Sequence, residues 1–161
     1  MTYVDQLQRV RRFLNRIDNP NANSAKPLSP QEQIDYEDML FGFFQNCWHL
    51  KDWIKNDITA PRTLSGPIET LWAQYQSLKL CADVANATKH LILNTSRVNG
   101  RLLRAIEARI NESVVSGEST TEVRYEYKIA DNAGNSHSAI AVARQAVSDW
   151  EKLITQNGGQ I

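Results

Sequence analysis

Helical periodicity dominates the stretch from Ser65 to Asn94 and constrains the fold more than any other feature of the chain. Apolar side chains recur there every three or four residues, the spacing that aligns them along one face of an α-helix. These positions are Ile68, Leu71, Tyr75, Leu78, Ala82, Ala85 and Ile92. Asp83, Asn86 and His90 follow the same spacing on a neighbouring face. We therefore expect one long helix with an apolar row beside a polar row.

Two further helices are predicted before this one. Thr2 and Asp5 form a weak capping pair, and the apolar pattern that follows predicts a helix from about Thr2 to Ile17. Residues 29–32 then combine a serine N-cap, a proline at the first helical position and a glutamate placed for a capping box. The helix that starts there runs to about Asn56, and its apolar seam is Tyr36, Leu40, Phe43, Cys47, Leu50 and Ile54. A facing seam on the long helix predicts that the two pack antiparallel.

The C-terminal part of the chain has the period of β-strands. Residues 123–129 alternate between apolar and charged side chains, which predicts a strand with one buried face. Residues 105–115 fit both a helix and a strand, and we interpret them as a strand because residues 116–119 then make a hairpin connection to the next one. A short strand is expected at 136–139 after an Asp/Asn/Gly turn. A helix from about Ile140 to Thr155 follows.

These elements predict an α+β fold that is mostly α. The length of 161 residues is that of one domain, so we expect a single domain over 1–161. Its parts are an antiparallel bundle of three N-terminal helices within 1–98, a small antiparallel β-meander within 99–139 and a C-terminal helix within 140–157.

Charge and cysteine content narrow the function classes. The 18 basic and 18 acidic residues cancel, so RNA or an anionic membrane would have to be met by a local patch. No apolar run approaches the ~18 residues of a membrane span, and we expect no membrane contact. Cys47 and Cys81 occupy apolar helical positions and are expected to be buried free thiols. Because the N-terminus also lacks a secretory signal pattern, we expect a cytoplasmic protein.

Candidate catalytic residues form two polar sets on the second and third helices. Phosphate loops, nucleophile elbows and zinc motifs are absent from the sequence, and no cofactor is expected. The two sets, which we expect to face each other, are His49 and Asp52, and Asp83, Asn86, Lys89 and His90. A histidine one turn from a carboxylate suits general acid–base catalysis, and asparagine and lysine suit phosphate or an oxyanion. The same groups suit an interhelical polar seam that fixes helix register.

A metal site is a weaker interpretation of the same residues. His49, Asp52, Asp83 and His90 are permissible ligands for zinc, iron or manganese, and helical bundles build such sites. Only His49 with Asp52 gives two ligands on one helix, and we predict no metal.

Aromatic and basic residues add candidate binding surfaces. Trp48 and Trp53 flank the two faces of the second helix, so a partner or the rest of the fold must cover part of them. Arg9, Arg12 and Arg16 share a face of the first helix. They suit contacts with phosphates, although a solvated helix surface is the commoner reason for such a row.

Residues 85–90 resemble the signature of the HEPN superfamily, the four-helix nucleotide-binding and ribonuclease domains of prokaryotic toxin, antiphage and RNA-processing systems. That signature is an arginine, often followed by a polar residue, with a histidine four to six residues after the arginine. Asn86 matches the polar position and His90 the histidine, whereas Ala85 stands where the family has arginine. The resemblance implies that His90 acts on the scissile phosphate. In our hypothesis His90 is the general acid–base, Asn86 and Lys89 orient or neutralise phosphate, and Asp83 positions one of them.

Two functions are therefore expected. The first is a cytoplasmic bacterial HEPN-like protein that binds RNA or a nucleotide, as a degenerate ribonuclease of a toxin or antiphage system, with His49 and Asp52 completing the pocket. The alternative is a non-catalytic protein-interaction or homodimerisation module, in which Trp48 or Trp53 faces the partner. Solvent access distinguishes them, because catalytic groups must line an open cleft and register groups are buried.

Overall fold

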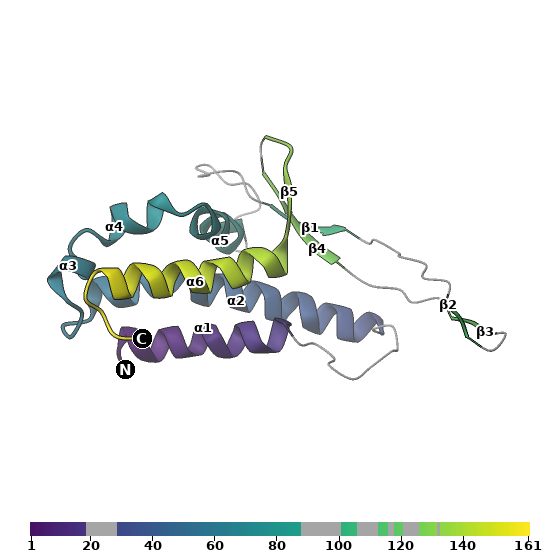
Figure 1. The fold of residues 1–161 in the computed structure, drawn as a ribbon, viewed down its shortest axis with the longest axis horizontal. Coiled ribbons are helices and arrows are strands. Elements are labelled where there is room, and N and C mark those ends of the chain that lie inside the picture. The colour runs from purple at the N-terminus through teal and green to yellow at the C-terminus, as the bar shows by residue number, and fades with distance from the viewer. Residues whose placement is uncertain (19–28, 88–100, 106–112, 116–117, 121–125, 132) are drawn as a thin grey trace.

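The fold is α+β and mostly helical, as the sequence predicts. The computed structural model describes residues 1–18, 29–87, 101–105, 113–115, 118–120, 126–131 and 133–161, with backbone alone within 101–126. Three long helices lie side by side: α1 (Tyr3–Asp18), α2 (Pro30–Asn56) and α6 (Ala139–Gln156), with α1 opposite in direction to the other two (Figure 1). Their predicted boundaries are confirmed to within two residues.

The capping box fixes where α2 begins. The Ser29 hydroxyl accepts from the Glu32 backbone N–H at 3.3 Å, and the Ser29 backbone N–H donates to the Glu32 carboxylate at 2.7 Å. These bonds satisfy donors that a helix N-terminus otherwise leaves open. Among the described residues, no helix combines the length and the apolar character that a membrane span needs, not even the 27-residue α2.

The prediction of one long helix from Ser65 to Asn94 is wrong. Its described part consists of α3 (Arg62–Ser65), α4 (Ile68–Leu71), the 3-10 turn η1 (Trp72–Gln74) and α5 (Gln76–Ala87), and the remainder lies outside the described residues. Gly66 and Pro67 separate the first two pieces, since proline lacks the N–H that would continue the helix. Tyr75 is extended, with φ −104° and ψ 121°, and separates η1 from α5.

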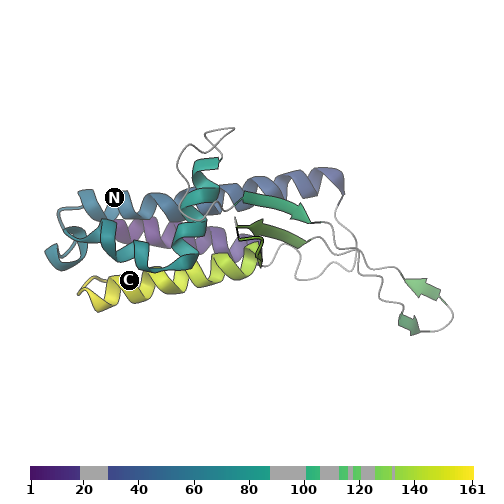
Figure 2. The ribbon, with the colours of Figure 1, turned by 90° about the horizontal axis from the view of Figure 1, so that it is seen from above.

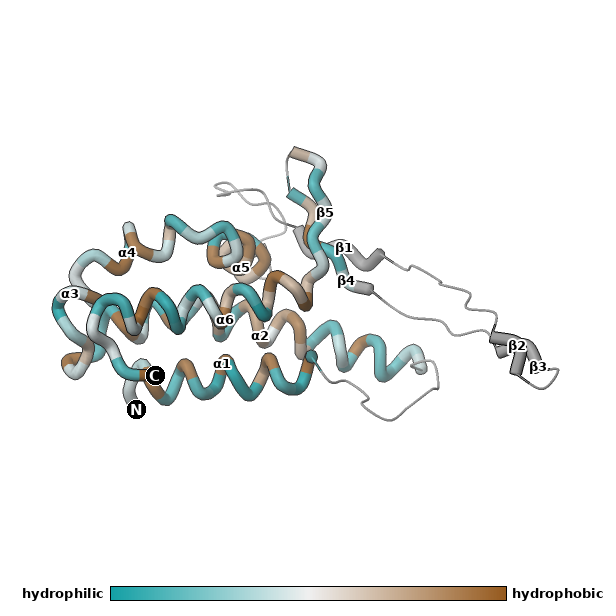
Figure 3. Tube along the Cα trace, in the orientation of Figure 1, coloured by the Kyte–Doolittle hydropathy of each residue, from teal (hydrophilic) through white to brown (hydrophobic). Residues whose placement is uncertain are grey.

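Helix α5 lies across α2 and α6 and does not run along α2. Figure 1 views α5 nearly end on, and Figure 2 shows it crossing above the long helices. The break at Tyr75 makes this change of direction possible, and the predicted antiparallel pairing of α2 with a long third helix is corrected accordingly. Figure 3 colours much of α5 as hydrophobic, in agreement with a helix enclosed by its neighbours.

The strands form two small antiparallel sheets. One has the order β1-β4-β5, from β1 (Arg101–Ala105), β4 (Glu126–Ala130) and β5 (Ser136–Ser138). The other pairs β2 (Ser113–Val115) with β3 (Glu118–Thr120) away from the helices (Figure 1).

The strand predictions are confirmed in part. The strand predicted at 123–129 is observed from Glu126, with Tyr127 and Ile129 buried; 123–125 lie outside the described residues. The strand at 136–139 is confirmed as β5, although Ala139 begins α6. Of the strand predicted at 105–115, only its ends are described, and both lie in strands. Its predicted hairpin partner is corrected: β2 pairs with 118–120, because the pairing of Val115 with Glu118 leaves the two-residue connection that hairpins prefer.

The core lies between the long helices, α5 and β4. Tyr127 of β4 packs on Tyr36 of α2 with ring centroids 5.4 Å apart, which attaches the sheet to the bundle. A Cβ on Gly42 would come within 2.8 Å of Phe13 Cε1, so this glycine allows α1 and α2 to approach closely.

Candidate functional site

The candidate residues on α5 are not equally accessible. Every residue from Leu80 to Ala85 is buried, and the Asp83 side chain is 0% exposed and engaged within the chain. Asn86, one turn further, is half-buried. Lys89 and His90 lie outside the described residues. A fully enclosed Asp83 suits the structural interpretation of the polar row better than direct contact with a substrate.

The histidine and the carboxylate on α2 do not form the expected pair. Asp52 accepts from Lys51 Nζ at 2.6 Å, and the described residues contain no bond between Asp52 and His49. His49 is half-buried and has its own interaction within the chain. His49 lies on α2, which packs on α5, but the facing of the two sets stays a prediction because Lys89 and His90 lie outside the described residues.

Trp48 is covered by its own chain. Its ring meets Trp72 edge to face, with centroids 4.8 Å apart, and Lys51 Nζ lies 4.7 Å from its ring centroid. The Trp72 indole N–H in turn donates to Glu69 at 3.1 Å. Partial burial raises the pKa of Glu69, but the bond from Trp72 and the charge of Lys51 outweigh it and hold that pKa below its usual range. Trp48 is therefore a core residue and does not need a partner to cover it.

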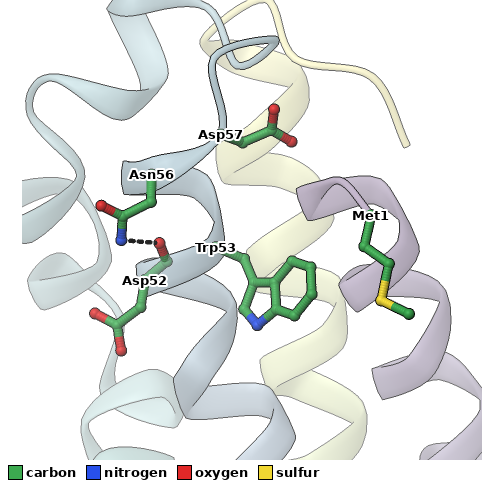
Figure 4. A pocket seen from close by; sticks show the side chains of 5 residues that line it. All are labelled: Met1, Asp52, Trp53, Asn56 and Asp57. Carbon is green, nitrogen blue, oxygen red and sulfur yellow. Dashed lines mark hydrogen bonds between the residues drawn. The ribbon is translucent and has the colours of Figure 1, made fainter.

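Trp53, in contrast, borders a hollow at the surface. This hollow of about 350 Å³ is lined by Met1, Asp52, Trp53, Asn56 and Asp57 (Figure 4). The Asn56 amide donates to the Asp52 backbone carbonyl at 2.8 Å and so keeps the end of α2 ordered. The hollow has the size of a small-ligand pocket and offers an aromatic ring with polar atoms beside it.

Asp57 on the border of this hollow has a structural role. Its carboxylate accepts from the Tyr3 backbone N–H at 2.7 Å and from the backbone and hydroxyl of Thr59 at 2.8 and 2.7 Å. Burial raises the pKa of Asp57, but these bonds outweigh it and lower that pKa. The carboxylate thus attaches the start of α1 to the end of α2.

The arginine row, defined as Arg9, Arg12 and Arg16 of α1, has its first member, Arg9, beside Trp53. Within the described residues none of the three has a carboxylate partner, whereas Arg11 of the same helix pairs with Glu151 at 2.6 Å. The Arg9 guanidinium lies 5.8 Å from the Trp53 ring centroid and donates to the Gln6 side chain at 2.7 Å.

Phe13 contacts the C-terminal member of the arginine row. The Arg16 guanidinium lies 5.8 Å from the Phe13 ring centroid. Stacking on aromatic rings orients a guanidinium without neutralising it. The sequence pattern identifies the row and Trp53 separately but not their contact, because Arg9 and Trp53 lie on different helices; the contact of Phe13 with Arg16, three residues further along α1, is local.

A buried polar group between α5 and α6 was missed entirely. The Ser77 hydroxyl and the Gln145 amide both donate to the Asp149 carboxylate, the latter at 2.9 Å. The spacing of the buried residues Ala146 and Leu153 assigns Asp149 to the core face of α6. A charged residue on a core face is the sequence signal that could have revealed this buried polar group.

Metal ligation finds no support in the described part of the chain. No group of three histidine, cysteine, aspartate or glutamate residues there could hold an ion. His90, one of the ligands considered, lies outside that part.

Comparison with known proteins gives no relative. No protein-family model, curated protein or solved structure matches the chain.

Proposed function

We propose that the protein binds single-stranded RNA or a nucleotide through the arginine row and Trp53. The observation that carries the proposal is a set of three guanidinium groups on one helix face, none neutralised by a carboxylate within the described residues and two stacked on aromatic rings. On a chain with a formal net charge of zero, such a local cluster supplies the attraction that the whole molecule lacks.

The dimensions of the row suit consecutive phosphates. Arg9 and Arg16 are seven residues apart, about 10 Å along a helix that rises 1.5 Å per residue. Two or three phosphates of one strand fit within that length, given an axial spacing of about 3.4 Å per nucleotide in a helical strand. Guanidinium groups also offer the paired donors that phosphate oxygens accept.

Trp53 provides a surface for a base. Bases of single-stranded RNA stack on aromatic side chains with little dependence on sequence. The hollow beside Trp53 leaves room for such a base, and Asp52 on its border offers an acceptor for an exocyclic amino group. Asp52 and Asp57 disfavour phosphate in the hollow itself, so the backbone of the RNA would follow the row.

This proposal keeps the RNA-directed role that the HEPN resemblance implies, in a cytoplasmic bacterial protein. The free thiols of Cys47 and Cys81 fit a reducing compartment. Cleavage by His90, oriented by Asn86 and Lys89, is a separate part of the proposal. It is tested by comparing wild type with His90→Ala on a mixed RNA pool, with cleavage measured on a gel.

Binding is tested by fluorescence anisotropy of a labelled, mixed-sequence single-stranded RNA over a range of salt concentrations. Three phosphate contacts predict a slope of log K against log salt of about −2, hence roughly 20-fold weaker binding at 200 mM than at 50 mM salt. The triple variant Arg9→Gln, Arg12→Gln and Arg16→Gln should lose most of that slope. Arg62→Gln, which removes an exposed arginine outside α1, is the matched control and should leave it unchanged.

Absence of RNA binding at 50 mM salt, or a triple variant with the slope of wild type, would refute the proposal. The homodimerisation or protein-interaction alternative would then stand, and light scattering tests it independently. Trp53→Ala separates the two parts of the surface: it should weaken binding and leave the salt slope in place, because a stacked base adds no phosphate contact.

A further inference from the structure

Two thiols meet in the core, outside the surface proposed for RNA. Cys47 of α2 and Cys81 of α5 are 0% and 1% exposed, and their Sγ atoms are 3.8 Å apart. Both cysteines are free, as the sequence predicts. The contact joins helices whose cysteines are separated by 34 positions in the chain.

The two sulfurs lie at van der Waals distance from each other. At 3.8 Å the sulfurs are already in contact, and a disulfide at about 2.05 Å requires them to approach by about 1.7 Å. Each cysteine lies inside a continuous helix, and both belong to the buried core. The helices therefore hold the two sulfurs together in the native state.

The surroundings of Cys81 favour its protonated thiol. Burial, the bond with Cys47 and the charge of Asp149 raise the pKa of the Cys81 thiol well above its usual range. Bulky disulfides have no access to a pair that is so fully enclosed. A hydroperoxide of nearly the size of water is the class of oxidant small enough for this site, and the raised pKa of Cys81 makes the reaction slow because the thiolate is the form that attacks peroxide.

We propose that Cys47 and Cys81 are a modification site, where a hydroperoxide forms a reversible disulfide that links α2 to α5. The sulfur of one cysteine attacks a peroxide oxygen and the O–O bond breaks, which gives a sulfenic acid and, with the thiol proton, one water. The second sulfur attacks the sulfenic sulfur and the S–O bond breaks, which releases a second water. The two sulfurs together lose two electrons, and the peroxide gains them.

The disulfide would fix the two helices that carry the candidate polar residues. Asp52 lies on α2 near Cys47, and Asp83 and Asn86 lie on α5 near Cys81. A covalent link between these helices restricts both the unfolded chain and any relative motion of the two sets. The proposal does not rest on RNA binding, because it is argued from the two sulfurs alone, although Trp53 of the proposed RNA surface lies on α2 as well.

The test is the thiol content and intact mass of the native protein after hydrogen peroxide. The treated chain is quenched with catalase, unfolded in urea with iodoacetamide and weighed by mass spectrometry. We expect a mass lower by two hydrogen atoms, no alkylation, and recovery of both alkylatable thiols with dithiothreitol. The Tm of the oxidised chain should rise by roughly 4–15 °C and return on reduction.

The single variants Cys47→Ala and Cys81→Ala are the matched controls, since neither can form the bond and neither should show the rise in Tm. Wild type that is unfolded in urea before oxidation gives the peroxide concentration and time that fully oxidise accessible thiols. A native chain that keeps both thiols after the same treatment overturns the proposal. Addition of oxygen atoms to Cys47 or Cys81 in a peptide map, or a covalent dimer, overturns it as well; oxygen on Met1 or Met39 does not, because peroxide also forms methionine sulfoxide. The wild-type peptide map decides even if a variant does not fold.

Discussion

Removal of the Ser77 hydroxyl is expected to destabilise the fold by about 2 kcal/mol. Ser77 and Asp149 are 6% and 9% exposed, so the carboxylate relies on two donors, the Ser77 hydroxyl and the Gln145 amide. A hydrogen bond to a charged group contributes about 1.5–3 kcal/mol, and its loss leaves a buried acceptor without water. Ser77→Ala creates only a small void, since it removes a single oxygen, so the lost bond dominates the effect.

Urea unfolding followed by circular dichroism measures this loss. With an m-value of about 2 kcal/mol/M, a loss of about 2 kcal/mol lowers the unfolding midpoint by about 1 M. Ser148→Ala makes the same chemical change on the exposed face of α6, and its free energy of unfolding should stay within about 0.5 kcal/mol of wild type. This control corrects for the greater helix propensity of alanine.

A double-mutant cycle isolates the Ser77–Asp149 interaction from other effects of each change. Ser77→Ala, Asp149→Ala and the double variant should give a coupling energy of about 1–2 kcal/mol, because the two side chains are in contact. Coupling below about 0.5 kcal/mol would refute the reasoning. It would mean that the hydroxyl contributes through packing and not through its bond to the carboxylate.

Three further predictions concern single residues. Since the pKa of Cys81 is raised in the folded state, the unfolded chain binds fewer protons than the folded chain above about pH 8.5. The free energy of unfolding, measured from urea midpoints, should therefore fall there by about 1.4 kcal/mol per pH unit. The fall should be less steep in Cys81→Ala, and equal slopes would contradict this prediction. Ser29→Ala breaks the capping box and should cost about 1 kcal/mol in the same assay, whereas no change would show that α2 begins independently of it. Gly158→Ala should lower the free energy of unfolding by about 1–2 kcal/mol, because the φ of Gly158 is +78°, in the left-handed region. Gly158→Asn should cost less, since asparagine tolerates left-handed backbone better than alanine, and the reverse order in thermal unfolding would refute this argument.

The sequence by itself determined the elements whose signals are local. The capping box at Ser29 fixed the start of α2, and the three-and-four spacing placed Leu40, Phe43 and Trp150 in the core. Alternation identified β4, because period two specifies which face is buried. These features need only neighbours a few residues away, so the amino-acid order contains them.

Tertiary structure alone decided how the third helical region is divided and which polar groups are accessible. The apolar spacing continues through Tyr75, yet the helix breaks there and α5 crosses the bundle, while Trp72 packs on Trp48. Apolar periodicity identifies one buried face of a helix, but it does not show whether a second element covers the opposite face. Asp83, on the polar row of α5, is buried in this way. Likewise, Trp53 becomes a neighbour of Arg9 only when α1 and α2 fold together, because contacts between distant segments depend on packing and not on spacing. Phe13 and Arg16, by contrast, are neighbours within α1 itself.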